Sequence, residues 1–563
     1  MKILSLHCDY IKFKPLKKAL KKVEELSEKQ KKGQEVKECL VILTAVEKTD
    51  SKNSVNSYFK EIKDIATQVK VKNIVIYPYA HLSKNLSSPD VAVNVMKEAE
   101  KILNKNFKVV RAPFGYYKEF ELKVKGHPLS ELSREINIQG VEDDKKYDSK
   151  QLLREISKAK LDTSKLKEND HRIIGRQMDL FSFNEAAPGM VFWHNNGLII
   201  RDELINFSKE ILRKENYELI STPEIMDKKL WIVSGHWDKY KENNFVTEYE
   251  KRKFLVKPMN CPGGMLVYRT NIKSYRDLPL RVGEFGTVHR QELSGVLAGL
   301  FRVIQFIQDD AHVFCTEDQL ENEINALIDL IGYFYDKFNL KYRIELSTRP
   351  KIRIGLDKIW DKSEKILERV LKKKKITFKL NKGDGAFYGP KIDFHVKDSL
   401  NREWQVGTIQ LDFSMPERFD LEYIDKDNKR KRPVMLHRAI YGSLERFIGI
   451  LIEHYNGRFP TWLAPTQVRV LSFTDKNKKY AEKIIKKIKE IPNIRLDSDL
   501  RSTTVSAKVK DAELNRIPYI LVVGDREEKS NSVAIRTRGN KKIENVKLDK
   551  FIKGLKVEIS SRK

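Results

Sequence analysis

Residues 281–315, which read RVGEFGTVHRQELSGVLAGLFRVIQFIQDDAHVFC, contain side chains that are well suited to binding a nucleotide. Two strand-like runs flank a Gly/Ser loop, and we expect Arg290 and Glu292 on the first run and Arg302 on the second. Guanidinium groups suit phosphate oxygens, a carboxylate suits an amino group, and Phe306 offers a ring for base stacking. The sequence contains neither common phosphate-binding glycine loop. A nucleotide-binding hairpin is therefore one interpretation, and a basic surface hairpin is the other.

The chain has a large positive surplus. Lys and Arg total 108 against 79 acidic residues, which gives a net charge of +29 and a pI of about 9.5. Such a surplus favours a polyanionic partner, because each neutralised phosphate releases counterions. A thermophile-type surface rich in Lys and Glu would produce a similar balance. The charge thus indicates a nucleic-acid partner without excluding that alternative.

Length and cysteine usage set the broad class. At 563 residues the chain exceeds one hydrophobic core, and typical domain sizes suggest several units. Four cysteines without C-x-x-C spacing argue against a disulfide framework or a zinc knuckle. The N-terminal apolar run ends at Asp9, and no stretch approaches the roughly 18 apolar residues of a membrane span. We therefore expect a cytoplasmic protein without a membrane partner.

Composition along the chain predicts several domains. Residues 1–140 alternate strand-like runs such as VILTAV and IVIYPY with charged, helix-favouring segments. Residues 141–170 are polar and helix-capable, which is typical of a linker helix. Residues 171–465 mix aromatic strands with amphipathic helices, and residues 466–563 alternate strand and helix as in a small α/β domain.

Several segments resemble class II aminoacyl-tRNA synthetases in their threonyl form. FGTVHRQE with GLFRVIQFIQDDAHVFC looks like motif 2, and PVMLHRAIYGSLERFIGIL at 433–451 looks like motif 3. Motif 1 is matched by GLIIRDELINFSKEILRKENYELISTPEIM at 197–226, with Pro223 as its proline. KPMNCPGGM and GAFYGPKIDF…WQVGTIQLDF are also similar to the threonyl subclass. The resemblance covers about residues 171–465 and implies an antiparallel sheet flanked by helices.

The resemblance implies how ATP is held. Arg290 would contact the α-phosphate that the threonine carboxylate attacks, and Arg446 would reach the far phosphates. Glu292 would bind the adenine amino group, and Mg²⁺ would bridge phosphate oxygens. The ATP set is completed by Arg302, Phe306 and Gln405. Positioning and charge neutralisation carry this step, so no covalent enzyme intermediate is needed.

A zinc site is implied in the same way. Cys261, His312 and His437 are separated by 51 and 125 residues, and each alone is more often a structural residue. Each lies at a position that binds zinc in the family, and one Cys with two His suits Zn²⁺ with an open fourth position. That position would receive the amino and hydroxyl groups of threonine, which lets the site reject isosteric valine.

The resemblance also assigns residues around the amino acid. Those expected to bind threonine are Met259, Gln308, Asp310, Tyr388 and Gln410. His236, in SGHWDKY, matches a histidine implicated in proton removal during transfer to the 3′-hydroxyl of tRNA.

Serine keeps the hydroxyl and lacks one methyl, which is worth only about 1–3 kcal/mol, so an editing site is expected. MKILSLHCDYIKF, VIYPYAHLS and RAPFGYYKEFELKVKGHPLSELSR resemble the archaeal threonyl-tRNA synthetase editing domain, itself similar to D-aminoacyl-tRNA deacylases. This implies that mischarged seryl-tRNA(Thr) is hydrolysed there, with the seryl-adenosine end surrounded by His81, Tyr117, Lys118 and Glu131. Read singly, each of these residues also fits a packed α/β domain with an exposed surface.

From TQVRVLSF onward the chain resembles the anticodon-binding domain shared by threonyl, prolyl, histidyl and glycyl enzymes. Glu527 and Arg536 match positions that read anticodon bases, for which a carboxylate and a guanidinium are suited. Ser502 replaces an asparagine that contacts the anticodon in bacterial relatives, so that contact is shorter, water-bridged or absent. Motif 1 forms a dimer interface in the family, which implies a homodimer.

Taken together, the resemblance implies an α/β and α+β multidomain threonine–tRNA ligase that uses ATP, L-threonine and tRNA(Thr). The expected order is an editing domain at 1–140, a linker helix at 141–170, a catalytic domain at 171–465 and an anticodon-binding domain at 466–563. A class II enzyme for proline or serine is an alternative, and the Cys/His/His set argues against it. A non-catalytic RNA-binding paralogue is another, and the retained phosphate-binding arginines argue against that.

Overall fold

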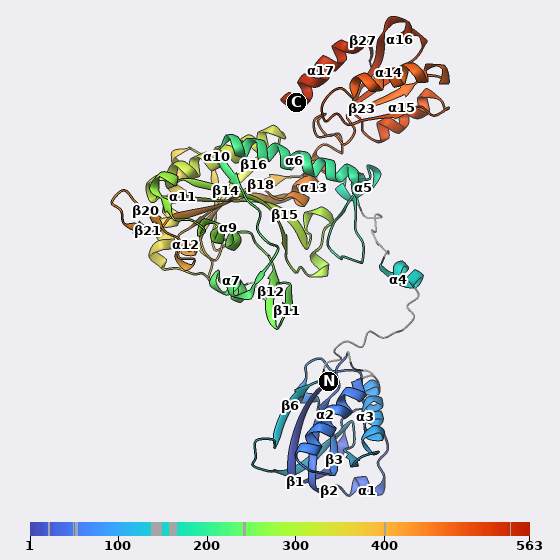
Figure 1. Ribbon diagram of the computed structural model, residues 1–563, viewed down its shortest axis with the longest axis vertical. Coiled ribbons are helices and arrows are strands. Elements are labelled where there is room, and N and C mark those ends of the chain that lie inside the picture. The colour runs from blue at the N-terminus through green and yellow to red at the C-terminus, as the bar shows by residue number, and fades with distance from the viewer. Residues whose placement is uncertain are drawn as a thin grey trace. The chain divides into compact units, whose positions relative to one another are not determined.

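The computed structural model describes residues 1–20, 23–48, 50, 54–136, 149–156, 166–239, 244–398, 401–540 and 542–562. The chain forms two compact units, Met1–Tyr147 and Asp148–Lys563 (Figure 1). The expected linker at 141–170 lies largely outside the described residues, although α4, Ser149–Ile156, falls within it. Across the described ranges, no helix is long and apolar enough to cross a membrane.

The first unit is built on one mixed sheet. Its strand order is β4-β3-β2-β1-β5, and β6 also pairs with β1. β1 runs antiparallel to β2, β5 and β6, whereas β3 is parallel to β2 and β4. The strands are β1 Lys2–Lys18, β2 Gln34–Ala45, β3 Asn73–Pro78, β4 Lys108–Arg111, β5 Tyr116–Val124 and β6 Glu131–Glu135.

Two amphipathic helices cover this sheet. α2, Ser54–Gln68, buries Val55, Tyr58 and Ile62, whose spacing of three to four residues places them on one helical face. α3, Pro89–Leu103, begins with a proline, which fits the first turn because the missing N–H has no partner there. Both helices pack against the apolar residues of β2 and β3.

The second unit contains an eight-stranded sheet with the order β17-β16-β18-β19-β22-β15-β14-β9. The expected antiparallel sheet is confirmed for its six central strands, whereas both edge strands, β9 and β17, pair in parallel. The strands are β9 Tyr217–Leu219, β14 Leu280–His289, β15 Gln305–Cys315, β16 Tyr342–Ser347, β17 Phe378–Asn381, β18 Lys391–Lys397, β19 Glu403–Asp412 and β22 Val434–Ser443.

The two faces of this sheet differ, because side chains alternate along each strand. On β15, Ala311, Val313 and Cys315 join the main core. That core also contains apolar residues of α6 Asn195–Lys214, α10 Leu320–Lys337, α11 Asp357–Lys373 and α13 Leu444–His454. Phe314 points the other way, into a smaller cluster with Met265 of α9, Cys261–Tyr268. Even-numbered residues of β15 therefore face the side that carries α9.

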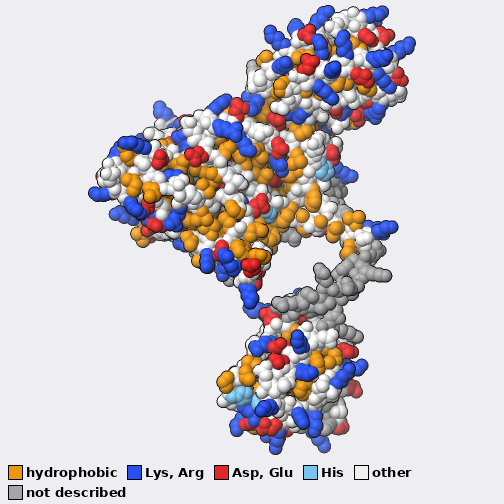
Figure 2. Space-filling view, in the orientation of Figure 1, with side chains coloured by type: hydrophobic (Ala, Val, Ile, Leu, Met, Phe, Trp, Pro, Cys, Tyr) orange, Lys and Arg blue, Asp and Glu red, His pale blue; other side chains and the backbone are white. Residues whose placement is uncertain are grey.

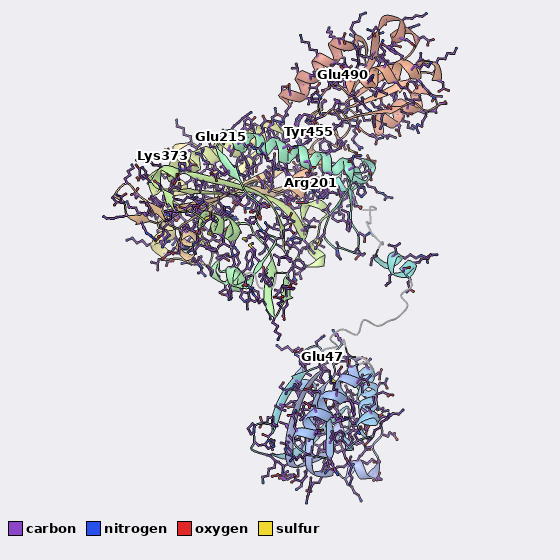
Figure 3. All side chains as sticks on the ribbon, in the orientation of Figure 1. Glu47, Arg201, Glu215, Lys373, Tyr455 and Glu490 are labelled. Carbon is purple, nitrogen blue, oxygen red and sulfur yellow. The ribbon has the colours of Figure 1, made fainter. Side chains whose placement is uncertain are left out.

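The C-terminal part of the second unit is a five-stranded sheet with the order β24-β23-β25-β26-β27. Its strands are β23 Val468–Ser472, β24 Leu496–Asp499, β25 Tyr519–Val523, β26 Ser532–Thr537 and β27 Ile543–Lys547. Helices α14 Lys478–Ile488 and α17 Leu548–Ser561 pack on one face, and α15 Val505–Leu514 packs on a separate cluster. Charged residues such as Lys373 and Glu490 remain exposed on the surface of the second unit (Figure 3).

Three arginines join this C-terminal part to the core that holds the eight-stranded sheet. Arg495 Nε donates to the Ala464 carbonyl at 2.9 Å, and Arg516 Nε donates to the Asn456 carbonyl at 2.9 Å. Arg538 Nη2 donates to the Arg458 carbonyl at 3.1 Å. All three acceptors are main-chain carbonyls of residues 456–464, the segment that follows α13. Backbone carbonyls therefore make most of the contacts at this junction.

Candidate functional site

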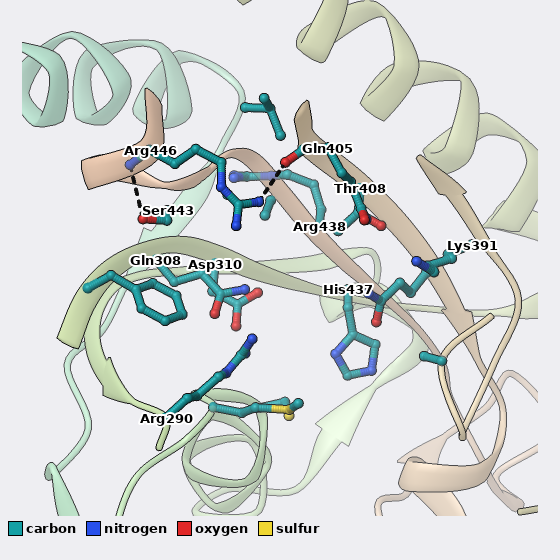
Figure 4. Close-up of a pocket in the computed structure, with 18 of the residues that line it drawn as sticks. Arg290, Gln308, Asp310, Lys391, Gln405, Thr408, His437, Arg438, Ser443 and Arg446 are labelled. Atoms are coloured by element: carbon teal, nitrogen blue, oxygen red, sulfur yellow. Dashed lines mark hydrogen bonds between the residues drawn. The ribbon is translucent and has the colours of Figure 1, made fainter. Parts of the chain in front are cut away.

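The core sheet holds a cavity of about 640 Å³ beside β15, β19 and β22 (Figure 4). Most of the residues that the sequence assigned to ATP, threonine and metal line it. These are Met259, Cys261, Arg290, Glu292, Arg302, Phe306, Gln308, Asp310, Tyr388, Gln405, Gln410, His437 and Arg446. The fold therefore gathers residues that are almost 190 positions apart in the chain into one site.

The hairpin arginines lie on the connecting loop, and the expectation that they lie on its two strands is wrong. β14 ends at His289 and β15 begins at Gln305, so Arg290, Glu292 and Arg302 all fall between the strands. Part of this loop folds into a 3₁₀ turn at Gly299–Phe301. Loop residues escape the strict alternation of a strand, which lets Arg290 and Arg302 both reach the cavity.

Three guanidinium groups meet at one end of the cavity. Arg290 lies over the ring of Phe306, 5.2 Å from its centroid, and Arg302 Nη2 lies 2.9 Å from Glu292 Oε2. Arg446 donates from Nε to the Phe301 carbonyl at 2.9 Å. Burial, together with repulsion from Arg302 and Arg290, lowers the pKa of Arg446. An anion placed among these cations would relieve that repulsion, so this end suits a polyphosphate.

The other end of the cavity is lined by polar side chains that can donate and accept hydrogen bonds. Gln308 and Asp310 lie two residues apart on β15, so they share the face that carries α9. Tyr388 donates its hydroxyl to Gln410 Oε1 on β19. Burial raises the pKa of Asp310 to about 6. These groups suit the amino and hydroxyl groups of a small polar substrate.

Asp309 explains how β15 and β22 are set around the cavity. The register between them shifts between Gln308 and Asp310, which leaves extra residues on β22. Asp309 accepts backbone N–H groups of Ile440, Tyr441 and Gly442, each at 2.9 Å. The carboxylate thus satisfies the N–H groups that the bulge removes from the ladder, and the bulge orients the ends of both strands.

Cys261, His312 and His437 come together as the resemblance implied. One potential ligand atom from each lies within 4.8 Å of the others, and all three residues are buried. Within the described residues, His312 Nε2 has no hydrogen-bond partner, and His437 Nε2 lies 2.9 Å from Asp412 Oδ2. A carboxylate that holds the second nitrogen of a histidine is a common feature around metal ligands. The donor set therefore fits a tetrahedral Zn²⁺ site with one open position.

Protonation also agrees with metal binding. Burial lowers the pKa of His312, which keeps its imidazole neutral, as a ligand must be. Burial raises the pKa of the Cys261 thiol, and a bound cation would reverse that preference by stabilising the thiolate.

His236 does not line the cavity. It is fully buried, and its Nε2 lies 2.8 Å from Met259 Sδ. Burial lowers the pKa of His236 to about 3. Its role in proton removal therefore stays a prediction, with Met259 lying between it and the cavity.

In the first unit, three of the four predicted editing residues lie toward one end of the sheet. Lys118 of β5 donates to the Pro113 and Tyr116 carbonyls at 2.9 and 3.0 Å and lies 5.1 Å from the Tyr77 ring centroid. His81 follows the end of β3, where Tyr77 is also located. Tyr117 is exposed.

Glu131 is separated from this group. It pairs with Leu6 of β1, whereas Lys118 pairs with Pro15, so their partners are nine positions apart on β1. That corresponds to about 30 Å along an extended strand. The unit does not bring Glu131 to Lys118 within one chain.

The predicted anticodon residues are partly engaged within their own domain. Glu527, on α16 Asp525–Ser530, accepts the Gly524 N–H at 3.0 Å. Arg536 lies on the next element, β26, and is partly exposed. Ser502 donates its hydroxyl to Asp475 at 2.8 Å, so this side chain already has a partner.

The structure adds cavity residues that the sequence did not single out, among them Lys391, Thr408 and Arg438 (Figure 4). Lys391 Nζ lies 3.0 Å from Asp393 Oδ2 and 3.3 Å from Asp384 Oδ2. The available signal was Lys391 and Asp393 two residues apart in the strand segment PKIDF, which places both charges on one face. A charged residue at such a position is rarely buried unless it is paired.

Comparisons with known proteins agree with this architecture. Residues 1–136 match the archaea-specific editing domain of threonyl-tRNA synthetase, and residues 244–455 match the class II tRNA synthetase core domain (G, H, P, S and T). Residues 467–558 match an anticodon binding domain. A solved structure of the RNA binding domain of threonyl-tRNA synthetase from Cryptosporidium parvum Iowa II superimposes with a TM-score of 0.68 at 38% identity. It covers 69% of this chain, which in turn spans 98% of that structure.

The chain belongs to the threonyl-tRNA synthetase family. A threonine–tRNA ligase of Caldanaerobacter subterraneus subsp. tengcongensis is 51% identical over 396 residues, which is 70% of this chain and 61% of that protein. A second solved structure, of the threonyl-tRNA synthetase ThrRS-1 from Aeropyrum pernix, has a TM-score of 0.61 at 26% identity. The match covers 70% of this chain and 96% of that structure. The match to this chain thus spans less than two thirds of the length of the Caldanaerobacter ligase.

Proposed function

We propose that this protein is a threonine–tRNA ligase that activates L-threonine with ATP, transfers it to tRNA(Thr) and removes mischarged serine. The observation that carries the proposal is the single cavity in which Arg290, Arg302 and Arg446 lie opposite a Cys/His/His cluster. Family membership and the three matched domains support it.

The residues of the cavity account for the activation step. ATP enters as its magnesium complex, with its phosphates among the three arginines and its adenine against Phe306 and Glu292. The threonine carboxylate attacks the α-phosphorus, the bond to the β-phosphate oxygen breaks, and pyrophosphate leaves. Charge neutralisation and alignment lower the barrier, so no side chain has to act as a nucleophile.

On the amino-acid side, Gln308, Asp310, Tyr388, Gln410 and Met259 would surround threonine. Cys261, His312 and His437 would hold Zn²⁺, which when bound would offer a ligand position that a hydroxyl can fill and a methyl cannot. Asp412 would keep His437 oriented through its 2.9 Å contact with Nε2.

The proposal is tested by amino-acid-dependent ATP–pyrophosphate exchange with threonine, serine, valine and proline, with and without a chelator. We expect strong exchange with threonine, weak exchange with serine, none with valine or proline, and loss of exchange on chelation. Proline-dependent exchange would favour a different class II ligase. Binding of tRNA without any exchange would favour a non-catalytic paralogue.

We also propose that residues 1–140 hydrolyse seryl-tRNA(Thr), with His81, Tyr117 and Lys118 near the seryl end and Glu131 in a separate role. The hydrogen-bond partners of the Lys118 ammonium are main-chain carbonyls, and burial lowers its pKa to about 8. Because its hydrogen-bond partners are carbonyls, the Lys118 ammonium can contact a phosphate or a carbonyl of the RNA end without first breaking an ion pair with a carboxylate.

The editing rate is expected to depend on the charge of Lys118. The ammonium is present below about pH 8 and is lost above it, so the catalysed rate relative to the spontaneous rate should fall through that pH. K118R should remove this fall, because arginine stays charged, and K118M should be slow at every pH. The measurement is hydrolysis of seryl-tRNA(Thr) from pH 6 to pH 9; a fall that persists in K118R would exclude Lys118 as its origin.

The C-terminal domain, residues 466–563, is proposed to bind the anticodon of tRNA(Thr) through Glu527 and Arg536. R536A is expected to weaken tRNA binding about 10- to 100-fold, because a guanidinium contact to a base edge is lost. Exchange without tRNA should stay unchanged. K542A, at an exposed lysine nearby, serves as the control and should have a small effect that does not depend on the anticodon sequence.

A homodimer is proposed on the basis of the apolar surface near motif 1. Hydrophobic side chains gather on one face of the core (Figure 2). The exposed apolar residues Ile225, Val246 and Tyr249 lie on one small sheet of β10 Ile225–Asp227, β12 Arg252–Val256 and β11 Val246–Tyr249, and Ile225 belongs to motif 1. A second copy would cover such a surface. We also propose that the protein is cytoplasmic. Residues 141–170 are proposed as the linker between the editing domain and a catalytic domain at 171–465.

A further inference from the structure

A buried histidine outside the cavity connects the start of the catalytic domain to the ATP-binding loop. His171 is the first residue of α5, His171–Gln177, and 1% of its surface is exposed. Its Nδ1 lies 2.8 Å from Glu453 Oε1 on α13, and Leu300 donates its backbone N–H to Nε2 at 3.0 Å. Because Nε2 accepts, the proton must be on Nδ1, where it is donated to Glu453. The contacts thus specify one tautomer.

Leu300 is the central residue of the Gly299–Phe301 turn, so His171 holds this turn in place. The His171 and Phe301 rings meet edge to face, with centroids 4.3 Å apart. A Cβ on Gly299, whose φ is +55°, would lie 2.3 Å from His171 Nε2. The turn can therefore approach the imidazole this closely only with glycine at position 299.

The Gly299–Phe301 turn orients Arg446 through a backbone carbonyl. The Phe301 carbonyl accepts from Arg446 Nε at 2.9 Å, and the Phe301 ring stacks on Trp404 with centroids 4.5 Å apart. Trp404 precedes Gln405, whose carbonyl accepts from Arg446 Nη1 at 2.9 Å. The Phe301 carbonyl that orients this guanidinium thus belongs to the turn itself, and the Gln405 carbonyl follows the tryptophan on which the Phe301 ring stacks.

A metal ion is the competing explanation, since Asp170, His171 and Glu453 offer ligand atoms within 4.8 Å of one another. Both nitrogens of His171 already take part in hydrogen bonds. Arg172 Nη2 lies 2.8 Å from Asp170, and Arg402 Nη2 lies 2.9 Å from Glu453. With both carboxylates neutralised and no ring lone pair free, the cluster is a set of hydrogen bonds.

We propose that His171 is a positioning residue for ATP: through Glu453 on one side and the Leu300 N–H on the other, it fixes the turn that aims Arg446 at the phosphates. This inference rests on the proposed ligase function for its kinetic consequence. It predicts an effect on ATP and none on threonine, because within the described residues the hydrogen bonds of the Gly299–Phe301 turn go to His171, Arg446 and the loop itself, and none goes to the Cys/His/His end of the cavity.

The test compares the native chain with H171A, H171Q and the matched control H194A. His194 also pairs with a carboxylate, at 2.6 Å from Asp179, but it lies on the surface and does not line the cavity. H171A should raise the KM for ATP in exchange about 10-fold, the cost of one hydrogen bond to a buried group, and leave the KM for threonine unchanged. H171Q, whose amide can accept from Leu300 and donate to Glu453, should restore most of the loss. H194A should match the native chain.

An unchanged KM for ATP in H171A would overturn the proposal. So would a parallel rise in both KM values that H171Q fails to correct, since that result indicates general destabilisation. If the native chain gives no threonine-dependent exchange, the ligase function fails, and His171 is then judged from ATP binding by calorimetry. A weaker Kd in H171A with recovery in H171Q supports the positioning role, and equal Kd values overturn it.

Discussion

Replacing Arg446 with alanine is expected to lower kcat/KM for threonine-dependent ATP–pyrophosphate exchange about 10³-fold. Arg446 reaches the cavity from the first turn of α13, and its guanidinium is held by the Phe301 and Gln405 carbonyls. Because these bonds fix the position of the guanidinium in advance, the site needs little reorganisation when negative charge develops on the phosphates. R446K should recover little, since an ammonium cannot occupy both carbonyls with the same geometry.

The control is R369A, which removes an exposed arginine of α11 that pairs with Glu321. This variant should show native exchange, because surface ion pairs contribute little. Circular dichroism and analytical ultracentrifugation would establish that R446A is folded. Native activity in a folded R446A variant would exclude Arg446 from the phosphate site and would weaken the motif 3 assignment.

Replacing Cys261 with alanine is expected to abolish metal binding and to reduce threonine-dependent exchange at least about 10²-fold. The remaining ligands, His312 and His437, would form an incomplete set with a much weaker affinity. The native protein should contain one zinc per chain by atomic absorption, and C261A close to none. ATP affinity by calorimetry should be unchanged, because the arginine end of the cavity is intact.

Cys315 supplies a matched control, since it is also buried but lies on the opposite face of the sheet, in the main core. C315A should keep its zinc and its threonine specificity. Full zinc content in C261A, or equal zinc loss in C315A, would contradict the assigned ligand set. Retained exchange in zinc-free C261A would show that threonine is selected by the other cavity residues alone.

Local patterns predicted much of the C-terminal domain. VRVLSF, YILVVG and SVAIRTRG correspond to β23, β25 and β26, and KYAEKIIKKIKEI corresponds to α14. These runs are short, strongly periodic and bounded by turns, so the sequence signal is local. The four-residue strand β24, LDSD, is mostly polar and was not singled out, because it lies at the sheet edge with few apolar contacts.

The metal end of the candidate site could be predicted only through family resemblance. Cys261, His312 and His437 come from α9, β15 and β22, and no spacing rule links residues that only a folded sheet brings together. The position of Arg290 and Arg302 on the loop depends on where two strands end, which is the least certain part of a strand prediction. The bulge capped by Asp309 and the His171–Glu453 contact depend on tertiary packing and leave no pattern in the sequence.

The junction between residues 456–464 and the C-terminal domain has a consequence for protein engineering. Arg495, Arg516 and Arg538 grip main-chain oxygens, which every amino acid provides. The catalytic side can therefore change its side chains freely without losing these bonds, provided that its backbone path is kept. A chimaera that receives an anticodon-binding domain from a distant relative would keep these three backbone contacts if its arginines are in register, and it would still need partners for Glu203 and Glu210, which pair with Arg495 and Arg562.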